Sequence, residues 1–163
     1  MAEQITDSRD MEQKVRRALK KMAASPLNLS TARELIRRVE EKAAEMGVKA
    51  VVAVSDASGR PIAIECMDGA YIGSFDVALN KTYTSVAFQM STAELAVLAA
   101  PGGSLYGIQH TNEGKIVIFG GGEPLYEDDV LIGAIGVSGG TAEQDTQLGA
   151  YGKMIAKEVI SWK

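Results

Sequence analysis

The feature that most constrains the fold is a set of four β-branched, apolar runs that come in two pairs. Residues 48–55 and 61–67 flank the turn sequence Asp56-Ala57-Ser58-Gly59, which predicts a β-hairpin. Residues 115–119 and 130–137 form the second pair. Because strands joined as hairpins run antiparallel, this order argues against a doubly wound parallel sheet.

Amphipathic helices are expected between and around these pairs. Residues 31–46 begin with a capping box and carry apolar side chains at helical spacing. The same periodicity predicts helices over residues 74–90, 91–98 and 141–162. The order α-ββ-α(α)-ββ-α therefore predicts an α/β (α+β) domain. We expect a profilin-like or PAS-like layered architecture, in which helices cover an antiparallel sheet.

A basic amphipathic helix is predicted before the domain. Residues 1–22 hold six Lys or Arg and four Asp or Glu, which gives them a net charge of +2, and their apolar residues recur at helical spacing. Pro26 interrupts the stretch that follows. The sequence thus predicts two parts, an appended helix with its linker over residues 1–28 and a domain over residues 29–163.

Composition narrows the classes of partner and compartment. The chain of 163 residues has a formal net charge of −4, whereas a nucleic-acid-binding surface needs an excess of Lys and Arg. No apolar stretch reaches the roughly 18–20 residues that span a bilayer, and the charged N-terminus does not read as a secretory signal. The one cysteine, Cys66, cannot form an internal disulfide. We therefore expect a cytoplasmic protein without a transmembrane segment or a nucleic-acid partner.

The single histidine, His110, is the candidate metal ligand. One histidine without a cysteine pair or a carboxylate cluster cannot build a structural zinc site. One imidazole is nevertheless enough to hold haem iron in an apolar crevice. The residues that could complete or replace it are Tyr71, Tyr83, Met67 and Met90. The alternative is a surface or hydrogen-bonded histidine without a ligand.

Lys81 and a run of three glycines are candidate ligand contacts. Lys81 lies on the otherwise apolar face of the helix predicted over residues 74–90, where a buried ammonium needs an anionic partner such as a propionate or a substrate carboxylate. A side chain that extends into solvent is the alternative. Gly120, Gly121 and Gly122 follow a β-branched run and predict either a close approach of a ligand to the backbone or a sharp chain reversal.

The sequence Gly136-Val137-Ser138-Gly139-Gly140 matches the G-x-S-x-G pattern of hydrolases. In those enzymes a histidine follows the nucleophile along the chain, whereas His110 precedes Ser138, and the domain is far smaller than an α/β-hydrolase. We interpret the pattern as a glycine-rich turn between a strand and a helix. Backbone N–H groups of residues 138–142 would attract an anion at that helix N-terminus, unless Thr141 satisfies them itself.

Several of these segments resemble the GlcG/HbpS/PduO-C haem-binding family. The resemblance covers roughly residues 29–160 in order, and its most specific part is residues 132–145, Ile-Gly-Ala-Ile-Gly-Val-Ser-Gly-Gly-Thr-Ala-Glu-Gln-Asp. The other matching segments are residues 53–63, 67–70, 78–82 and 119–125.

The resemblance implies a layered α/β fold, assembly into homo-oligomers, and binding of haem or another small ligand. Relatives of the PduO type carry this domain behind a corrinoid adenosyltransferase domain and belong to operons for propanediol or related microcompartments. In some members the axial histidine lies nearer the N-terminal helix, whereas residues 31–46 contain no histidine here. Residues 1–22 also resemble encapsulation peptides that dock cargo on microcompartment shells; an arm that stabilises an oligomer is the alternative.

Three functional hypotheses follow. The first is a small-ligand-binding protein that holds haem, a corrinoid or a small anionic metabolite near Lys81, His110 and the triple glycine. It would be cytoplasmic or enclosed in a bacterial microcompartment. The second hypothesis is an accessory enzyme that acts on small oxygenated metabolites, and the third is a structural, oligomeric cargo subunit.

Overall fold

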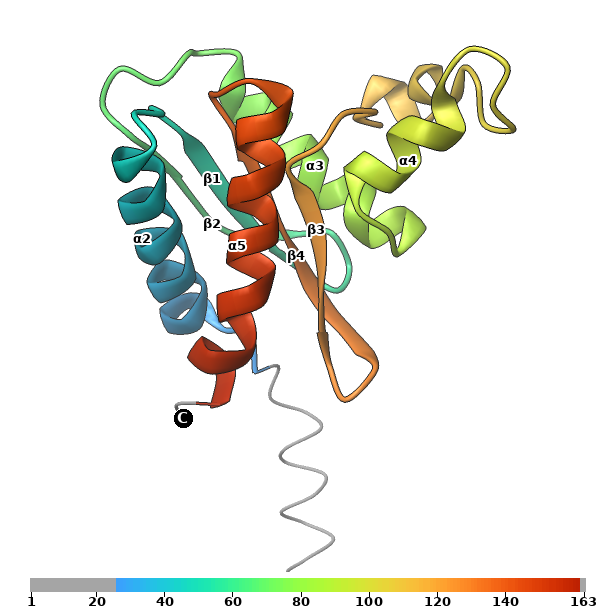
Figure 1. Ribbon diagram of the computed structural model, residues 1–163. Helices are drawn as coiled ribbons and strands as arrows, with labels where there is room; N and C mark the ends of the chain where they lie inside the picture. Colours follow the sequence, from blue (N-terminus) through green and yellow to red (C-terminus); the bar gives the residue numbers. More distant parts are fainter. Residues whose placement is uncertain (1–25, 162–163) are drawn as a thin grey trace, which may run out of the picture.

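A four-stranded antiparallel sheet organises the protein in the computed structural model, which describes residues 26–161 (Figure 1). The strands are β1 (Val51–Asp56), β2 (Pro61–Cys66), β3 (Gly122–Glu127) and β4 (Val130–Ser138). They lie in the order β2-β1-β4-β3, and neighbouring strands pair antiparallel. β1 and β4 are therefore the central strands, and β2 and β3 are the two edges.

Both hairpins close through turns that contain residues with positive φ values, a backbone conformation that is not found in regular strands. In the first turn the Asp56 carboxylate accepts hydrogen bonds from the N–H groups of Ser58 and Arg60, and Gly59 adopts a φ of +77°. In the second turn Asp128 and Asp129 have φ values of +47° and +64°. Short polar side chains and glycine tolerate this left-handed region, which is the backbone geometry of tight hairpins.

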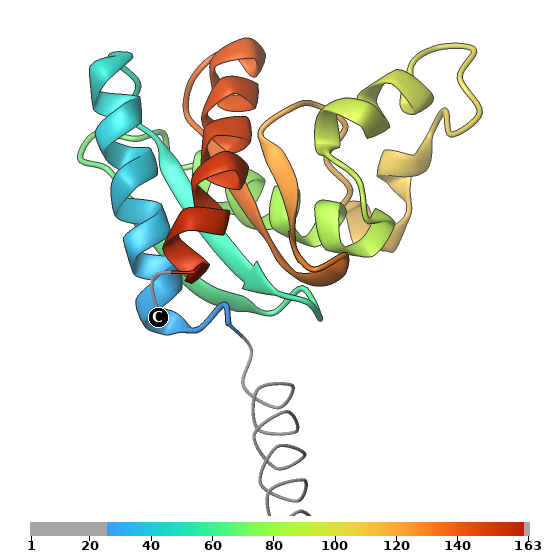
Figure 2. The ribbon, with the colours of Figure 1, turned by 60° about the horizontal axis from the view of Figure 1, so that its bottom comes forward.

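The helices form one layer on each face of the sheet. α2 (Leu29–Glu45) and α5 (Ala142–Ser161) lie side by side over one face, and α3 (Ser74–Phe88) covers the other (Figures 1 and 2). The predicted layered α+β fold and its order of elements are confirmed. Within residues 26–161 no helix is both long and apolar enough to cross a membrane.

Side chains of a strand alternate between the two faces of the sheet, so that successive residues face different helical layers. Val52 and Val54 belong to the apolar core under α2 and α5, whereas Ala53 packs with Ala78 of α3. On the adjacent strand a Cβ at Gly136 would collide with the carbonyl oxygen of Ala78. The sheet thus presents small residues toward α3, so that this helix lies unusually close to the strands.

An arm formed by residues 92–117 projects from the β3 side of the sheet (Figure 1). It contains α4 (Thr92–Ala99) and two short 3₁₀ helices, Ile108–His110 and Asn112–Gly114. Both of its ends are fixed to the body: the N–H of Val117 donates to Thr84 Oγ1 on α3, and the N–H of Gly122 donates to Thr92 Oγ1.

The strand predicted over residues 115–119 is wrong, because the third strand is β3, which begins at Gly122, the last glycine of the run. Ile116 and Val117 are buried, as their apolar character requires, but they pack at the base of the arm. The backbone of Val117 bonds to a threonine side chain instead of a neighbouring strand. A run of β-branched residues predicts that the segment is buried, but a buried segment need not pair with a neighbouring strand.

The predicted appended helix over residues 1–22 lies outside the described residues, but the boundary of the domain can be tested. Leu27 is 2% exposed within the main core, and the Asn28 side chain caps α2 by accepting the N–H of Thr31. We expect removal of residues 1–24 to leave the urea midpoint nearly unchanged. Removal of residues 1–28 should cost about 3 kcal/mol or more, since it deletes a core leucine and a helix cap. Equal destabilisation by the two truncations would make the N-terminal segment part of the fold.

Candidate functional site

A buried ion pair joins the helical layers on the two faces of the sheet. Lys81 of α3 is 0% exposed, and its Nζ donates to Asp145 Oδ2 of α5 at 2.8 Å and to the Val137 carbonyl oxygen of β4 at 2.6 Å. The ring of Phe119 covers the ammonium, with its centroid 4.9 Å from Nζ. Lys81 therefore has two oxygen acceptors and an aromatic face around it.

Asp145 also organises the glycine-rich turn before α5. Its second oxygen, Oδ1, accepts the N–H of Gly140 at 2.9 Å. Thr141 and Gln144 form a reciprocal cap in which each side chain accepts the backbone N–H of the other residue. Side chains of the chain itself thus satisfy N–H groups at this helix N-terminus, which is the alternative to anion binding there.

Both charges of the Lys81–Asp145 pair are buried away from water, which affects the pKa of Lys81. Burial lowers the pKa of Lys81, and the nearby carboxylate of Asp145 opposes that shift by favouring the ammonium. A buried ammonium without its carboxylate would carry the full cost of desolvation. The predicted need of Lys81 for an anionic partner is met here by Asp145.

The glycines at positions 120–122 are packed tightly against three helices. A Cβ on any of them would fall within 3.0 Å of protein atoms, and Gly121 has a φ of +113°. The side chains beside them are Lys81 and Ser85 of α3, Thr92 of α4, and Asp145 and Thr146 of α5. The structure therefore brings Lys81 and Gly121 together, and the close approach that these glycines permit is made by the chain itself.

His110 lies on the arm, apart from the contacts of Lys81. It ends the first 3₁₀ helix and is exposed, and within residues 26–161 its imidazole has no hydrogen bond or ion pair. Tyr106 and Val97 of the same arm are 68% and 73% exposed. The described residues contain no group of three His, Cys, Asp or Glu side chains that could hold a metal ion.

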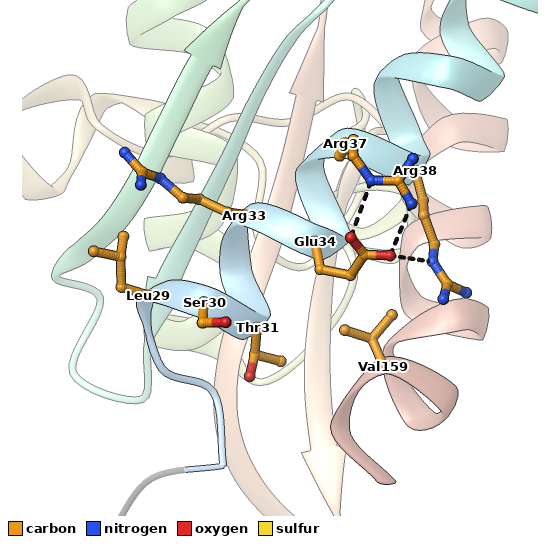
Figure 3. A pocket seen from close by; sticks show the side chains of 8 residues that line it. All are labelled: Leu29, Ser30, Thr31, Arg33, Glu34, Arg37, Arg38 and Val159. Carbon is orange, nitrogen blue, oxygen red and sulfur yellow. Dashed lines mark hydrogen bonds and ion pairs between the residues drawn. The ribbon is translucent and has the colours of Figure 1, made fainter. Parts of the chain in front are cut away.

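A groove of about 760 Å³ lies between the N-terminal half of α2 and the end of α5 (Figure 3). Its lining residues are Leu29, Ser30, Thr31, Arg33, Glu34, Arg37, Arg38 and Val159. Glu34 accepts hydrogen bonds from Arg37 and Arg38, which lower its pKa to about 2. Arg33 points away from this cluster (Figure 3) and has no ion pair with the described residues. Sequence reasoning did not identify this groove.

The protein matches a known family over most of its length. The sequence model of the family described as "Haem degrading protein HbpS-like" matches residues 27–152. A 15.0 kDa protein of Citrobacter freundii, encoded in the dhaT-dhaS intergenic region, is 43% identical over 129 residues, which are 79% of this chain and 91% of that protein. The corrinoid adenosyltransferase PduO of Salmonella typhimurium is 39% identical over 71% of this chain, which spans only 34% of that enzyme.

Two solved structures share this fold, and their sequence identities to this chain are similar to those of the relatives above. The Klebsiella pneumoniae protein ORFY has a TM-score of 0.77 at 39% identity, covering 83% of this chain and 90% of that structure. A PduOC:haem complex has a TM-score of 0.75 at 36% identity, covering 78% of this chain and 93% of that structure.

The buried ion pair generates a stability prediction. Lys81→Met leaves the Asp145 carboxylate buried without its cation, and Asp145→Leu does the same to the ammonium, so each single variant should lose about 3–5 kcal/mol of unfolding free energy. The double variant should lose clearly less than the sum, because no unpaired charge remains. Urea denaturation of the four proteins measures the coupling. Additive losses would show that the pair contributes no coupling energy.

Proposed function

Because this chain belongs to the HbpS-like family, we propose that it is a small-ligand-binding protein whose ligand is haem. The observation that carries the proposal is its likeness to the PduOC:haem complex, at 36% identity over 78% of this chain. The family description, "Haem degrading protein HbpS-like", points to the same ligand. When bound, haem would supply an iron centre for redox or ligand-binding chemistry.

We assign His110 as the axial ligand. It is the only histidine in the sequence, and its exposed imidazole has no competing partner among the described residues. Exposed Tyr106, Val97 and Leu98 give the arm apolar surface on which a macrocycle can pack. The donor type and the exposed apolar side chains of the arm therefore fit a haem held by one nitrogen ligand.

In this proposal Lys81 and Gly120–Gly122 position the arm. A direct contact of Lys81 with a propionate would require displacement of Asp145, which already lies 2.8 Å from Nζ. The ammonium instead fixes Phe119 and Gly121, at the point where the chain returns from the arm to the sheet. The orientation of His110 relative to the body thus depends on a residue that does not touch the ligand.

The groove between α2 and α5 is a second place for the same ligand. Its lining combines Leu29 and Val159 with three arginines, and Arg33 is available to a propionate. Its lining contains no His, Cys, Met or Tyr, so a haem bound there would take an axial ligand from elsewhere or from solvent. The two placements predict different sensitive residues.

We expect haem added to the protein to produce a Soret band with saturable binding. His110→Ala should shift the Soret maximum and weaken the affinity by at least about tenfold, a loss of about 1.4 kcal/mol, and added imidazole should restore the wild-type spectrum. Tyr106→Phe is the matched control, since it removes the hydroxyl group of another exposed residue of the arm and keeps its aromatic ring. An unchanged His110→Ala spectrum would exclude histidine ligation, and a protein without any Soret band would exclude haem.

The placement is tested by Arg33→Glu, which reverses an exposed charge in the groove and breaks no ion pair of the described residues. If haem binds at His110, this variant should keep the wild-type dissociation constant within about twofold. A large loss of affinity with an unchanged Soret maximum would move the ligand to the groove, because a propionate partner alters binding and leaves the iron untouched.

A further inference from the structure

A second concave surface lies at the end of the molecule where the described chain begins. This pocket of about 540 Å³ lies between the turn of the β3–β4 hairpin and the C-terminal end of α5 (Figure 1). Its lining residues are Tyr126, Glu127, Asp128, Asp129, Lys157 and Ile160. Tyr126 and Ile160 are half-buried, whereas Asp128 and Asp129 of the turn are exposed. The pocket, which we call the hairpin pocket, thus has apolar walls and an acidic rim.

The acidic rim of the hairpin pocket has no cation paired with it within residues 26–161. None of Glu127, Asp128 and Asp129 makes an ion pair with another described residue. Lys157, the only cation in the lining, is exposed and is also unpaired among the described residues. Three carboxylates against one ammonium leave an excess of negative charge, which a basic partner would compensate.

The chain enters the described structure close to this pocket. Leu27 belongs to the main core, and a Cβ at Gly133 of β4 would lie 2.6 Å from Leu27 Cδ2. Gly133 is four residues from Asp129 of the turn, a distance of about 13 Å along a strand. Since an extended chain spans about 3.3 Å per residue, the six steps from Leu27 back to Lys21 reach up to about 20 Å. The residues that end at Lys21 can therefore reach the pocket.

The segment that arrives there has the complementary composition. Residues 14–22, Lys-Val-Arg-Arg-Ala-Leu-Lys-Lys-Met, hold five Lys or Arg and no Asp or Glu. Their apolar residues recur at helical spacing, so that one side of the segment could contact Tyr126 and Ile160 while basic side chains meet the carboxylates. An apolar stripe flanked by positive charge thus matches a pocket with apolar walls and an acidic rim.

We propose that residues 14–22 dock in the hairpin pocket of the same chain. A short tether keeps the segment at an effective concentration on the order of millimolar, so that even weak contacts hold it. The groove between α2 and α5 also lies near the start of the described chain, but it carries Arg33, Arg37 and Arg38 against Glu34. Those arginines would repel a basic segment, and charge therefore selects the hairpin pocket.

The docking is a reversible surface contact. Exposed ion pairs contribute little to stability and are screened by salt, so we still expect the domain to fold when residues 1–24 are removed. The apolar side of the segment is covered in the docked state and becomes accessible when the segment is released. A partner that binds the segment through an acidic surface therefore has to compete with the β3–β4 turn.

Limited trypsin digestion of the complete chain tests the docking, because trypsin cleaves after the basic residues of the segment. Asp128→Asn/Asp129→Asn removes two carboxylates and keeps the turn, since Asn also tolerates the positive φ of both positions. Cleavage tracks the undocked population, so at low ionic strength this variant should be cut within residues 14–21 at least about fivefold faster than the wild type. In about 1 M salt, where the Debye length is about 3 Å, the ratio of the two rates should approach one.

The matched control for the digestion is Asp68→Asn/Asp76→Asn, which removes the same charge at exposed positions outside the hairpin pocket. Its cleavage rate should stay within about twofold of the wild-type rate, because unpaired charges beyond a Debye length are largely screened. Equal rates in the wild type and the Asp128→Asn/Asp129→Asn variant at low ionic strength would overturn the proposal. Equal acceleration by the control would also overturn it, because net charge would then explain the effect.

Carbodiimide crosslinking identifies the occupant of the pocket, because the reagent joins an ammonium to a carboxylate that it contacts. We expect mass spectrometry to find Lys20 or Lys21 joined to residues 127–129 in chains that still run as monomers on denaturing electrophoresis. Crosslinks mainly to Glu34 or Glu158 would place the segment at the groove between α2 and α5 instead. Crosslinks to residues 127–129 found only in a dimeric band would place it on a second copy, and either result would contradict docking in the chain's own pocket.

Discussion

The Lys81–Asp145 pair is the interaction on which the rest of the structure depends, because it connects layers that the sheet otherwise separates. Lys81 comes from α3 on one face and Asp145 from α5 on the other, and the lysine also bonds to the carbonyl of Val137 in β4. The contact requires the backbone to pass close to the ammonium, which explains glycine at position 121. Pairing and hydrogen bonding offset the cost of burying both charges, so that each partner is tolerated only with the other.

The arm formed by residues 92–117 is more independent than the body of the molecule. The arm has few buried apolar side chains, among them Leu95, Ala99 and Ile116, whereas the body contains the main core between the sheet, α2 and α5. A segment with a small core of its own opens locally at a lower free energy than the body does. A ligand-binding histidine on such a segment can adjust to its ligand while the sheet stays rigid.

The sequence predicted most of the architecture because its signals were local. Turn residues, capping boxes and periodicity act over a few residues, and they located the first hairpin, β4 and the four helices. The capping box expected at the start of residues 31–46 was wrong, because α2 begins at Leu29 and Asn28 is its N-cap. The strand over residues 115–119 failed because burial at the base of the arm produces the same apolar run as strand pairing does. Lys81 could be recognised as a buried cation that needs a partner, but Asp145 lies 64 residues away, and no local pattern links them. The groove was missed because the arginines of α2, read alone, resemble an ordinary solvated helix face.

The two hydrogen bonds that hold the ends of the arm also affect which sequence changes the arm can tolerate during evolution. Thr84 of α3 holds the returning end through Val117, and Thr92 holds the starting end through Gly122, so both ends are fixed by bonds outside the arm's interior. Lengthening a loop whose ends are already held together adds little closure entropy, roughly 0.6 kcal/mol for each doubling of its length. Insertions and deletions between these two threonine contacts should therefore accumulate during evolution with little effect on the sheet, so that ligand preference can change while the fold persists.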